Sequence, residues 1–441
     1  MPYAGGMSEL LHDHAVILAI GDELTLGQKL DTNSQWLSAH LRTRGITTRR
    51  HETVPDNLEQ LTCAMRRAAH EAPLVICTGG LGPTPDDLTR HALADVLEEQ
   101  LETDVNALAN LEARFAARNR QVSANQRLQA LRPSSAHMLD NPMGTAPGLC
   151  ANITTDGHTS TVFCLPGPPR EMQPMFVNHV APVLRTNRQV QTAVLHSAGL
   201  PEADVAQRLG NLMNRDRNPT VGTTASGGIV SLRIRFESNS DDTSALNETV
   251  LQVRAALDPF IFGAGDDTLA SVVLHKLREQ RERLVTVESC TGGLLGAALT
   301  EVPGASDVYW GGWVTYANEM KMQQVGVPKD LLDAHGAVSA EAAQAMARGA
   351  LAAPGCKSVH HVLAITGIAG PSGGSDEKPV GTVFVARAAR SGESEVRRFL
   401  ITGDRQDIRT RSVTMALAML RMHLDQLDVR PLLWEQSGTG L

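Results

Sequence analysis

One repeated pattern organises the chain: short apolar runs of strand length alternate with amphipathic segments of helix length. Between residues 15 and 170, the runs 15–20, 74–77 and 161–165 are predominantly apolar, and segments such as 58–70 repeat apolar residues at helical spacing. Continuously apolar strands are typical of parallel sheets that helices cover on both faces. The pattern therefore predicts a three-layer α/β domain over residues 15–170.

The pattern changes twice further along the chain. Residues 171–265 show the order strand, helix, two strands, helix, strand, which is typical of a small α+β module with a KH-like strand order. Residues 266–427 return to alternating strands and helices. The predicted fold class is thus α/β, with two three-layer domains separated by the small module. Residues 1–14 are expected to form a leader and residues 428–441 a tail.

Composition limits what such domains can bind. The formal net charge is −8 and aromatic residues make up only 3% of the chain, which argues against a dedicated nucleic-acid-binding protein. No apolar run approaches the roughly 18 residues of a membrane span. The six cysteines contain no Cys-x-x-Cys pair, which favours reduced thiols over a zinc site. We therefore expect a cytoplasmic protein that contacts neither membrane nor nucleic acid.

The first candidate site lies at Ser289 in the second α/β domain. Ser289 follows a predicted strand and precedes a helical pattern, where free backbone N–H groups can stabilise a developing oxyanion. An ordinary helix cap with tight glycine packing would use the same residues. The neighbouring Cys290 is a rival nucleophile, because a helix N-terminus lowers the pKa of a thiol. We expect the side chain of Cys290 to point away from that of Ser289.

Tyr316 and Lys321 are candidate partners of this serine. Residues five apart on one helix diverge by about 140°, so the two side chains converge only if Tyr316 ends a strand and Lys321 lies in the first turn of the next helix, with Asn318 as its cap. Only six of the 40 basic residues are lysines, and a desolvated lysine can act as a base, whereas arginine cannot. The structural alternative is a surface lysine beside a buried tyrosine.

Two further segments of this domain suit a ligand. The loop that begins at Thr366 is rich in small residues, so backbone amides can approach a ligand and the Thr366 hydroxyl can donate to a phosphate or a carbonyl. Arg405 lies at the start of the last long helix, where it or Arg409 can bind a phosphate or remain a solvated charge.

In the first domain, a glycine turn leads into two adjacent acids. Gly79, Gly80 and Gly82 leave backbone amides open to a phosphate, and Asp86 and Asp87 can hold a divalent cation against it. On a helix, two adjacent carboxylates cannot both face one site, so one is expected to be the ligand and the other the helix cap. The sequence does not decide which.

Further polar residues follow the first predicted strand. Asp22 and Glu23 come directly after it, and Asn33 follows a short loop. Ligands of open α/β sheets bind at the carboxyl ends of the strands. These residues are therefore expected near the glycine turn.

The motifs of the second α/β domain resemble the CinA (competence/damage-inducible) family, whose C-terminal domain is a nicotinamide-nucleotide amidase. The match runs through Glu288-Ser289-Cys290-Thr291-Gly292-Gly293, Thr315-Tyr316, Lys321 and Thr366-Gly367-Ile368-Ala369-Gly370-Pro371. The resemblance implies hydrolysis of nicotinamide mononucleotide without a cofactor, with Ser289 as nucleophile and Tyr316 and Lys321 as the groups that activate it. The residues implied to bind the substrate are Cys290, Thr291, Gly292, Gly293, Thr366, Gly367, Gly370 and Arg405.

The first domain resembles the N-terminal domain of the same family, which is similar to molybdopterin-binding domains. The match includes Ile20-Gly21-Asp22-Glu23-Leu24, Asp31-Thr32-Asn33, residues 78–89 and Gly144-Thr145-Ala146-Pro147-Gly148. The resemblance implies a metal-dependent ADP-ribose pyrophosphatase in a homodimeric protein of pyridine nucleotide recycling. The implied substrate-binding residues are Gly79, Gly80, Gly82, Thr84 and Asn33, and the implied ligands of the divalent metal are Asp86, Asp87, Asp22 and Glu23.

Two other functions are compatible with these motifs. The first domain can bind a pterin or a nucleotide without hydrolysing it, since the fold and loops are shared. The family's name suggests an interaction factor in DNA uptake or repair. Residues 185–258, however, contain eight Arg against eight acidic residues and lack the Gly-x-x-Gly loop with which KH domains clamp nucleic-acid backbones. A linker and assembly role is the better interpretation of the small module.

Overall fold

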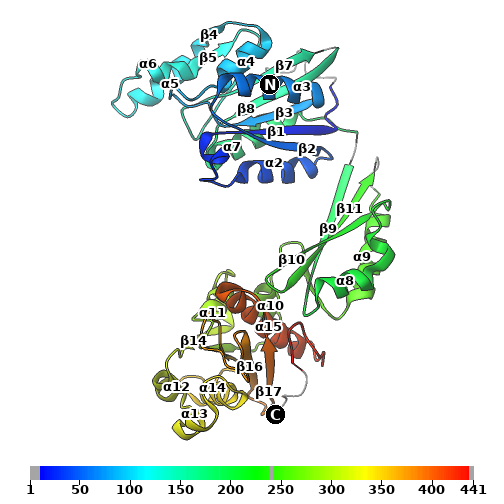
Figure 1. Cartoon of the computed structure of the whole chain (residues 1–441), viewed down its shortest axis with the longest axis vertical. Coiled ribbons are helices and arrows are strands. Elements are labelled where there is room, and N and C mark those ends of the chain that lie inside the picture. Colours follow the sequence, from blue (N-terminus) through cyan, green and yellow to red (C-terminus); the bar gives the residue numbers. More distant parts are fainter. Residues whose placement is uncertain (1–9, 156, 188, 239–241, 437–441) are drawn as a thin grey trace. The chain divides into compact units, whose positions relative to one another are not determined.

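The computed structural model describes residues 10–155, 157–187, 189–238 and 242–436. The chain divides into two compact units (Figure 1): unit 1 comprises Met1–Gln191 and Glu237–Asp242, and unit 2 comprises Thr192–Phe236 and Thr243–Leu441. Each unit has its own sheets and its own buried cores.

Unit 1 is built on a six-stranded sheet with the strand order β2-β1-β3-β8-β7-β6. The first four strands are parallel, whereas β7 and β6 run antiparallel to their neighbours. The strands are β1 (His14–Ile20), β2 (Thr47–Val54), β3 (Leu74–Thr78), β6 (His137–Leu139), β7 (Gly148–Thr155) and β8 (His158–Leu165). A separate two-stranded sheet pairs β4 (Leu101–Thr103) with β5 (Leu131–Pro133).

Helices cover both faces of the large sheet. Val16 and Leu18 of β1 pack into the core that contains α3 and α4, whereas Ala15 and Ile17 pack into the core that contains α2 and α7. Because successive side chains of a strand point to opposite faces, this alternation produces three layers and confirms the predicted fold class. The helices are α1 (Asp22–Thr25), α2 (Thr32–Arg42), α3 (Leu58–Glu71), α4 (Thr89–Leu97), α5 (Val105–Ala116), α6 (Ala124–Arg127) and α7 (Pro169–Met175).

Residues 171–187 belong to unit 1 and not to the middle module, where we had predicted them. Met172, Met175 and Phe176 are fully buried and pack with the apolar face of α2. These side chains fill one face of the large sheet, so the segment completes the first domain. Unit 1 therefore extends to Gln191.

The middle module has the predicted α+β order. Its four-stranded sheet runs β10-β11-β9-β12, and α8 and α9 pack together against it, as Figure 1 shows. The elements are β9 (Gln189–Ala198), α8 (Glu202–Leu209), β10 (Thr220–Ser226), β11 (Ile229–Ser238), α9 (Ser244–Leu257) and β12 (Ile261–Ala264).

The C-terminal domain is the second predicted α/β domain. Its five-stranded sheet runs β14-β13-β15-β16-β17, with β14, β13 and β15 parallel and the last two antiparallel. The strands are β13 (Leu284–Glu288), β14 (Tyr309–Val314), β15 (His361–Gly367), β16 (Thr382–Ala389) and β17 (Ser394–Leu400). One face packs against α10 (Leu269–Gln280), α11 (Leu294–Thr300) and α15 (Arg405–Leu424), the other against α12 (Asn318–Val325), α13 (Lys329–His335) and α14 (Ala340–Ala352).

A single hydrophobic core joins the middle module to the C-terminal domain, and α15 connects them by hydrogen bonds. The buried Arg421 donates to the main-chain carbonyls of Pro259 and Ile261 beside β12. Near the middle of α15, the Thr414 hydroxyl donates to the Gly227 carbonyl, in the turn between β10 and β11, over 2.8 Å. These contacts fix the module against the helix.

The described part of the predicted tail packs on the same interface. Leu432 is buried, and the N–H of Leu433 donates to the Gly199 carbonyl over 2.8 Å. The Trp434 ring lies under the Arg411 guanidinium, 5.3 Å from its centroid. Residues 437–441 and 1–9, at the two ends, lie outside the described residues.

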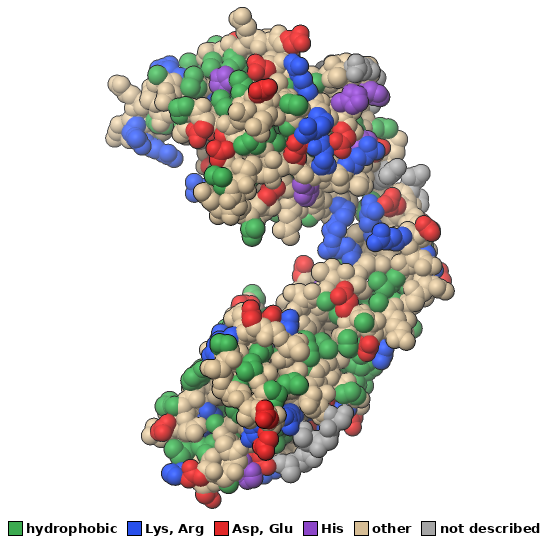
Figure 2. Space-filling model, in the orientation of Figure 1, with side chains coloured by type: hydrophobic (Ala, Val, Ile, Leu, Met, Phe, Trp, Pro, Cys, Tyr) green, Lys and Arg blue, Asp and Glu red, His purple; other side chains and the backbone are tan. Residues whose placement is uncertain are grey.

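Charged side chains of both signs cover the surface of the units. Figure 2 shows acidic and basic side chains intermingled over the visible face of each unit. Among the described residues, every helix is too short or too polar to cross a membrane.

We expect Arg421→Met to lower the free energy of unfolding of unit 2 by about 2–4 kcal/mol, because it leaves the carbonyls of Pro259 and Ile261 without their donor and leaves Asp425 with Lys276 as its remaining cation. Chemical denaturation of the full chain measures this. Arg254→Met on α9 is the matched control, since the Arg254 side chain makes no hydrogen bond or ion pair with the described residues. Equal stability of the two variants would contradict the role given to Arg421.

Candidate active sites

Ser289 lies on the turn between β13 and α11. Its N–H donates to the Ile365 carbonyl over 2.9 Å, and its carbonyl accepts from the N–H of Gly292 over 3.1 Å. Gly292 and Gly293 have φ angles of 60° and 97°, which glycine adopts without strain and which turn the chain into α11. Backbone contacts on both sides therefore hold the serine at the carboxyl end of β13.

A buried carboxylate occupies the N-terminus of α11. Glu288 is 2% exposed, and its side chain accepts hydrogen bonds from three backbone N–H groups, those of Gly293 (2.9 Å), Leu295 (3.0 Å) and Gly296 (2.8 Å). The prediction that the first N–H groups of this helix are free is wrong for these three. The N–H groups of Cys290 and Thr291 donate to no described residue, and both residues are buried. Sequence reasoning missed this role of Glu288, whose only signal was its position before Ser289.

Lys321 reaches Ser289 from the neighbouring strand-to-helix connection. Its Nζ donates to the Ser289 Oγ over 3.2 Å, to the Thr315 carbonyl over 2.9 Å and to the Tyr316 carbonyl over 3.3 Å. Lys321 is 1% exposed, and burial lowers the pKa of its amine. It lies in the first turn of α12, as the five-residue spacing predicts, although Asn318 is the first helical residue and not the cap.

Tyr316 lies at the mouth of the site. Its side chain is 61% exposed, and its hydroxyl accepts a hydrogen bond from Arg405 over 3.0 Å. Within the described residues that hydroxyl forms no hydrogen bond with Ser289 or Lys321, so only the Tyr316 carbonyl takes part in the lysine network. The geometry associates the Tyr316 side chain with the arginine and not with the nucleophile.

The two residues after Ser289 are buried. Cys290 packs in the hydrophobic core and is 6% exposed, and burial raises the pKa of its thiol to about 12. A thiol with this pKa is protonated at neutral pH, which disfavours Cys290 as the rival nucleophile. Thr291 is fully buried, and its hydroxyl has no partner among the described residues.

The loop after β15 has a structural role, and its Thr366 hydroxyl is not a free donor for a ligand. The buried Thr366 donates its hydroxyl hydrogen to the Ala337 carbonyl over 2.7 Å, so the predicted donation to a ligand is not available. A side chain on Gly367 would overlap Val383 and the Thr382 carbonyl of the neighbouring strand. Both residues therefore fix the loop: Thr366 by its hydrogen bond to the Ala337 carbonyl, and Gly367 by leaving room for the neighbouring strand.

Two arginines of α15 flank a pocket of about 520 Å³ at this edge. Arg405 donates to the Gly370 carbonyl over 2.5 Å as well as to Tyr316. Arg409, the other arginine that the sequence offers as a phosphate ligand, donates to the Thr291 carbonyl over 2.8 Å. The remaining pocket lining includes Ala369, Pro371, Val380 and Gly403. The arrangement places positive charge beside the serine loop.

In unit 1, the glycine turn after β3 is set by close backbone contacts. A side chain on Gly79 would overlap the Ile20 carbonyl, and the φ angle of Gly79 is 111°. The buried Arg90 donates to the carbonyls of Leu81 and Gly82, and burial lowers its pKa to about 10. The Leu81 carbonyl and the Gly82 N–H belong to the same trans peptide and point in opposite directions. Because the Leu81 carbonyl faces Arg90, the Gly82 N–H points away from Arg90. That N–H can meet a phosphate.

The structure distinguishes Asp86 from Asp87. The Asp87 carboxylate accepts from the Thr84 N–H over 2.8 Å and from its hydroxyl over 2.5 Å. This closes a turn, so that α4 begins only at Thr89. Asp86 is exposed beside the turn. Asp87 and Thr84 are therefore structural partners, whereas Asp86 is the more exposed acid, and the nearby Thr84 hydroxyl lowers its pKa.

Asp86 belongs to a group of acids that includes one residue the sequence did not reveal. Burial and the neighbouring charges of Asp22, Asp86 and Glu23 raise the pKa of Asp56, which follows β2. Asp22 and Asp56 are joined by reciprocal hydrogen bonds, each carboxylate accepting from the other's N–H over 3.1 and 2.9 Å. The charges of three of the four predicted metal ligands thus act on Asp56, whereas Asp87 faces the turn instead.

These acids do not form a preformed metal cage. Within residues 10–155, 157–187, 189–238 and 242–436, no three His, Cys, Asp or Glu side chains form a group that could hold a metal ion. The carboxylates present fit a hard cation that is bound by one or two of them together with phosphate oxygens, as Mg²⁺ commonly is.

Asn33 connects the same edge of the sheet. Its Nδ2 donates to the Thr78 hydroxyl over 2.9 Å and to the Gly167 carbonyl over 2.7 Å. The Asn33 Oδ1 has no partner among the described residues. Asn33 therefore has no donor left for a ligand, and its remaining acceptor is buried.

Comparison with known protein families covers most of the chain. A model described as "Probable molybdopterin binding domain" matches residues 16–186, one described as "Damage-inducible protein CinA KH domain" matches residues 192–263, and one described as "CinA C-terminal domain" matches residues 266–424. These ranges follow the three structural parts described above.

Relatives match over nearly their whole length. The chain is 43% identical over 417 residues to a CinA-like protein of Synechococcus sp. (strain RCC307), covering 92% of this chain and 98% of that protein. It is 41% identical over 418 residues to a CinA-like protein of Synechococcus sp. (strain CC9902), covering 92% and 97%. A crystal structure of the competence/damage inducible protein CihA from Agrobacterium tumefaciens is 42% identical and covers 36% of this chain and 94% of its own, with a TM-score of 0.34.

Proposed function

Because the chain belongs to the CinA family, we propose that it is a bifunctional nucleotide hydrolase of pyridine nucleotide recycling. Its C-terminal domain hydrolyses the carboxamide of nicotinamide mononucleotide to nicotinate mononucleotide and ammonia, and its N-terminal domain hydrolyses ADP-ribose with a divalent metal. The observation that supports the amidase most strongly is the 3.2 Å contact between the buried Lys321 Nζ and the Ser289 Oγ.

The proposed amidase reaction proceeds through an acyl-enzyme. Neutral Lys321 takes the proton of the Ser289 hydroxyl as Oγ bonds to the carboxamide carbon, and the C=O electrons move to the oxygen. Collapse of this intermediate breaks the C–N bond, and Lys321 returns the proton to the departing ammonia. Water then attacks the ester carbon, giving up a proton to Lys321, and the proton returns to Ser289 as the carboxylate leaves.

The surrounding residues supply charge stabilisation and binding. The N–H groups of Cys290 and Thr291 donate to the oxyanion, which is where preorganised donors have their largest effect. Glu288 supports this role indirectly by holding the following turn. Arg405 and Arg409 bind the phosphate of the nucleotide, since guanidinium groups match phosphate oxygens, and Tyr316 orients Arg405.

We expect Ser289→Ala to lower ammonia release from nicotinamide mononucleotide by at least about 10³-fold. Cys290→Ala is the matched control and should retain most of the activity, because the protonated thiol takes no part in the reaction. Coupled detection of ammonia with the purified full chain measures both. Loss of activity in Cys290→Ala with retention in Ser289→Ala would reverse the assignment.

The amidase should depend on pH through Lys321. The neutral amine is the competent base and burial lowers its pKa, so kcat/KM should rise with pH and level off below the ordinary lysine pKa of about 10.4. Lys321→Arg should remove this rise together with the activity, because arginine keeps its proton. Lys329→Arg, at an exposed lysine paired with Asp333, should leave the profile unchanged. A profile that falls as pH rises would contradict the role of Lys321 as base.

For the N-terminal domain, the support comes from the glycine turn and the acids beside it. The Gly82 N–H contacts the ligand, and Asp86, with Asp22 or Glu23, holds the divalent cation. A bound cation neutralises diphosphate charge and polarises a phosphoryl oxygen. Arg90 keeps the turn in shape by binding its carbonyls. Cleavage of ADP-ribose gives AMP and ribose 5-phosphate.

EDTA should stop AMP release from ADP-ribose and leave ammonia release nearly unchanged, because only the first reaction uses a metal. Asp86→Asn should reduce AMP release by at least about 10²-fold without changing the melting temperature. Asp87→Asn should instead destabilise unit 1 by about 1 kcal/mol, since it weakens the bonds from Thr84. Binding of ADP-ribose without any AMP release would contradict hydrolysis and favour a pterin- or nucleotide-binding module.

A further inference from the structure

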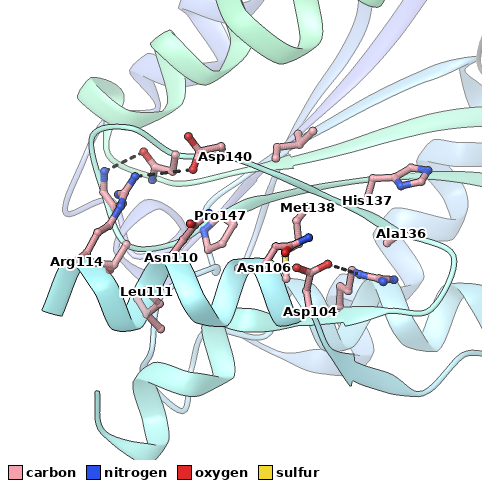
Figure 3. Close-up of a pocket in the computed structure, with 16 residues that line it drawn as sticks. Asp104, Asn106, Asn110, Leu111, Arg114, Ala136, His137, Met138, Asp140 and Pro147 are labelled. Carbon is pink, nitrogen blue, oxygen red and sulfur yellow. Dashed lines mark hydrogen bonds and ion pairs between the residues drawn. The ribbon is translucent and has the colours of Figure 1, made fainter. Parts of the chain in front are cut away.

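The two arginines at the amidase pocket are held in place without help from acids. In a pocket of unit 1, by contrast, Figure 3 shows Arg114 directed toward Asp140, whose carboxylate lies 3.8 Å away. Among the described residues, Arg405 and Arg409 form no ion pair and donate only to neutral oxygens. Their charges stay available to a ligand, so their positions depend on the backbone of α15 and of the loop before it.

A third arginine of α15 holds that loop. Arg411 donates to the Thr402 carbonyl and forms an ion pair with Asp407 over 3.2 Å. The Asp407 N–H donates over 2.9 Å to the carboxylate of Asp404, which is the N-cap of α15. Arg411 and Asp407 therefore fix both ends of the loop formed by residues 402–404.

This loop is also a wall of the amidase pocket. Gly403 and Asp404 line the pocket together with Arg405. A side chain on Gly403 would overlap Asp407 and Arg411, so the loop lies directly against this pair. A displacement of Arg411 would therefore move the pocket wall and the first residue of the helix, Arg405.

The indole ring of Trp434 covers Arg411. The guanidinium carbon lies 5.3 Å from the ring centroid, which is a cation–π distance. Trp434 has a φ angle of 65°, a left-handed conformation that is strained in a non-glycine residue and persists only where the surroundings fix it. The Leu400 N–H donates to the Trp434 carbonyl over 2.9 Å. One residue earlier, the Leu433 N–H donates to the Gly199 carbonyl of the middle module over 2.8 Å.

The middle module contacts the same indole ring and the same helix. A side chain on Gly228, in the turn between β10 and β11, would lie 3.1 Å from the indole and 3.4 Å from the Thr414 methyl group. The Thr414 hydroxyl donates to the carbonyl of the preceding Gly227. At about 100° per residue, Thr414 lies on the face of α15 opposite Arg405. The turn thus packs behind the helix whose front carries the arginines.

We propose that Trp434 and the turn between β10 and β11 are positioning elements for the substrate phosphate in the amidase domain. They hold Arg411, Arg411 holds residues 402–404, and these residues set the direction of Arg405. The proposal rests on the proposed amidase function and gives the middle module a part in it. Because the phosphate takes no part in the bond changes, loss of this support weakens binding of the ground state and the transition state alike. It should therefore raise KM and leave kcat unchanged.

Substitution of Trp434 in the full chain tests this. Trp434→Gly removes the ring, and glycine adopts a φ angle of 65° without strain. We expect the KM for nicotinamide mononucleotide to rise at least about tenfold, with kcat within about twofold of wild type. Trp434→Phe keeps an aromatic ring over Arg411 and should retain most of the wild-type KM. Trp310→Ala is the matched control, because Trp310 is an exposed tryptophan that lies under Arg283, 4.5 Å from its centroid, and does not line the pocket.

A milder variant covers the case in which Trp434→Gly does not fold, which the melting temperature reveals. Thr414→Val keeps the shape of the side chain and removes its hydrogen bond to the Gly227 carbonyl. We expect it to raise KM in the same way by a smaller factor, about two- to threefold. A fall in kcat with unchanged KM, in either variant, would overturn the positioning role.

Hydrogen exchange separates failure of this inference from failure of the amidase. Mass spectrometry reports the exchange of the amides of residues 402–409 without any substrate, and we expect Trp434→Gly to speed it and Trp310→Ala to leave it unchanged. Faster exchange in Trp434→Gly, combined with no ammonia release by the wild-type chain, would reject the amidase and retain the support of the loop. Unchanged exchange at residues 402–409 in Trp434→Gly would reject that support whether or not ammonia is released.

Discussion

The active-site end of the C-terminal domain depends on one buried carboxylate. Glu288 has no cation beside it in the described part of the chain, so its charge is compensated by the three backbone N–H groups of the turn and α11. Its main-chain carbonyl accepts from the N–H of Thr315 over 2.7 Å, and the Thr315 carbonyl in turn accepts from Lys321. Glu288 thus fixes both the turn that carries Ser289, the proposed nucleophile, and the connection that carries Lys321, the proposed base.

The environment of Lys321 balances two opposing effects on its protonation. Burial disfavours the charged amine and lowers its pKa, whereas three oxygen acceptors stabilise the ammonium form. No carboxylate forms an ion pair with Lys321 among the residues that the structure describes. Without such a partner, the neutral amine stays accessible, which is what separates a lysine base from a structural salt bridge.

Helix α15 connects the middle module to the C-terminal domain within unit 2. The first turns of α15 carry Arg405 and Arg409, and later turns bind the Gly227 carbonyl and the strand β12. The turn between β10 and β11 is therefore held by α15. A module that shares a hydrophobic core with its neighbour stabilises that helix, so its position bears on Arg405 and Arg409, the proposed phosphate ligands.

The sequence predicted those features that local rules determine. The order of strands and helices along the chain, the three layers and the entry of Lys321 in a first helical turn follow from periodicity and spacing. No local pattern encodes three other features. The direction of the Tyr316 side chain and the approach of Asp56 to Asp22 depend on contacts between segments distant in sequence. The role of Glu288 depends on which backbone donors the turn leaves free. Asp86 and Asp87 are the sharpest case, because they are chemically identical neighbours. Only the closure of the Thr84–Asp87 turn consumes one carboxylate and leaves the other for a ligand.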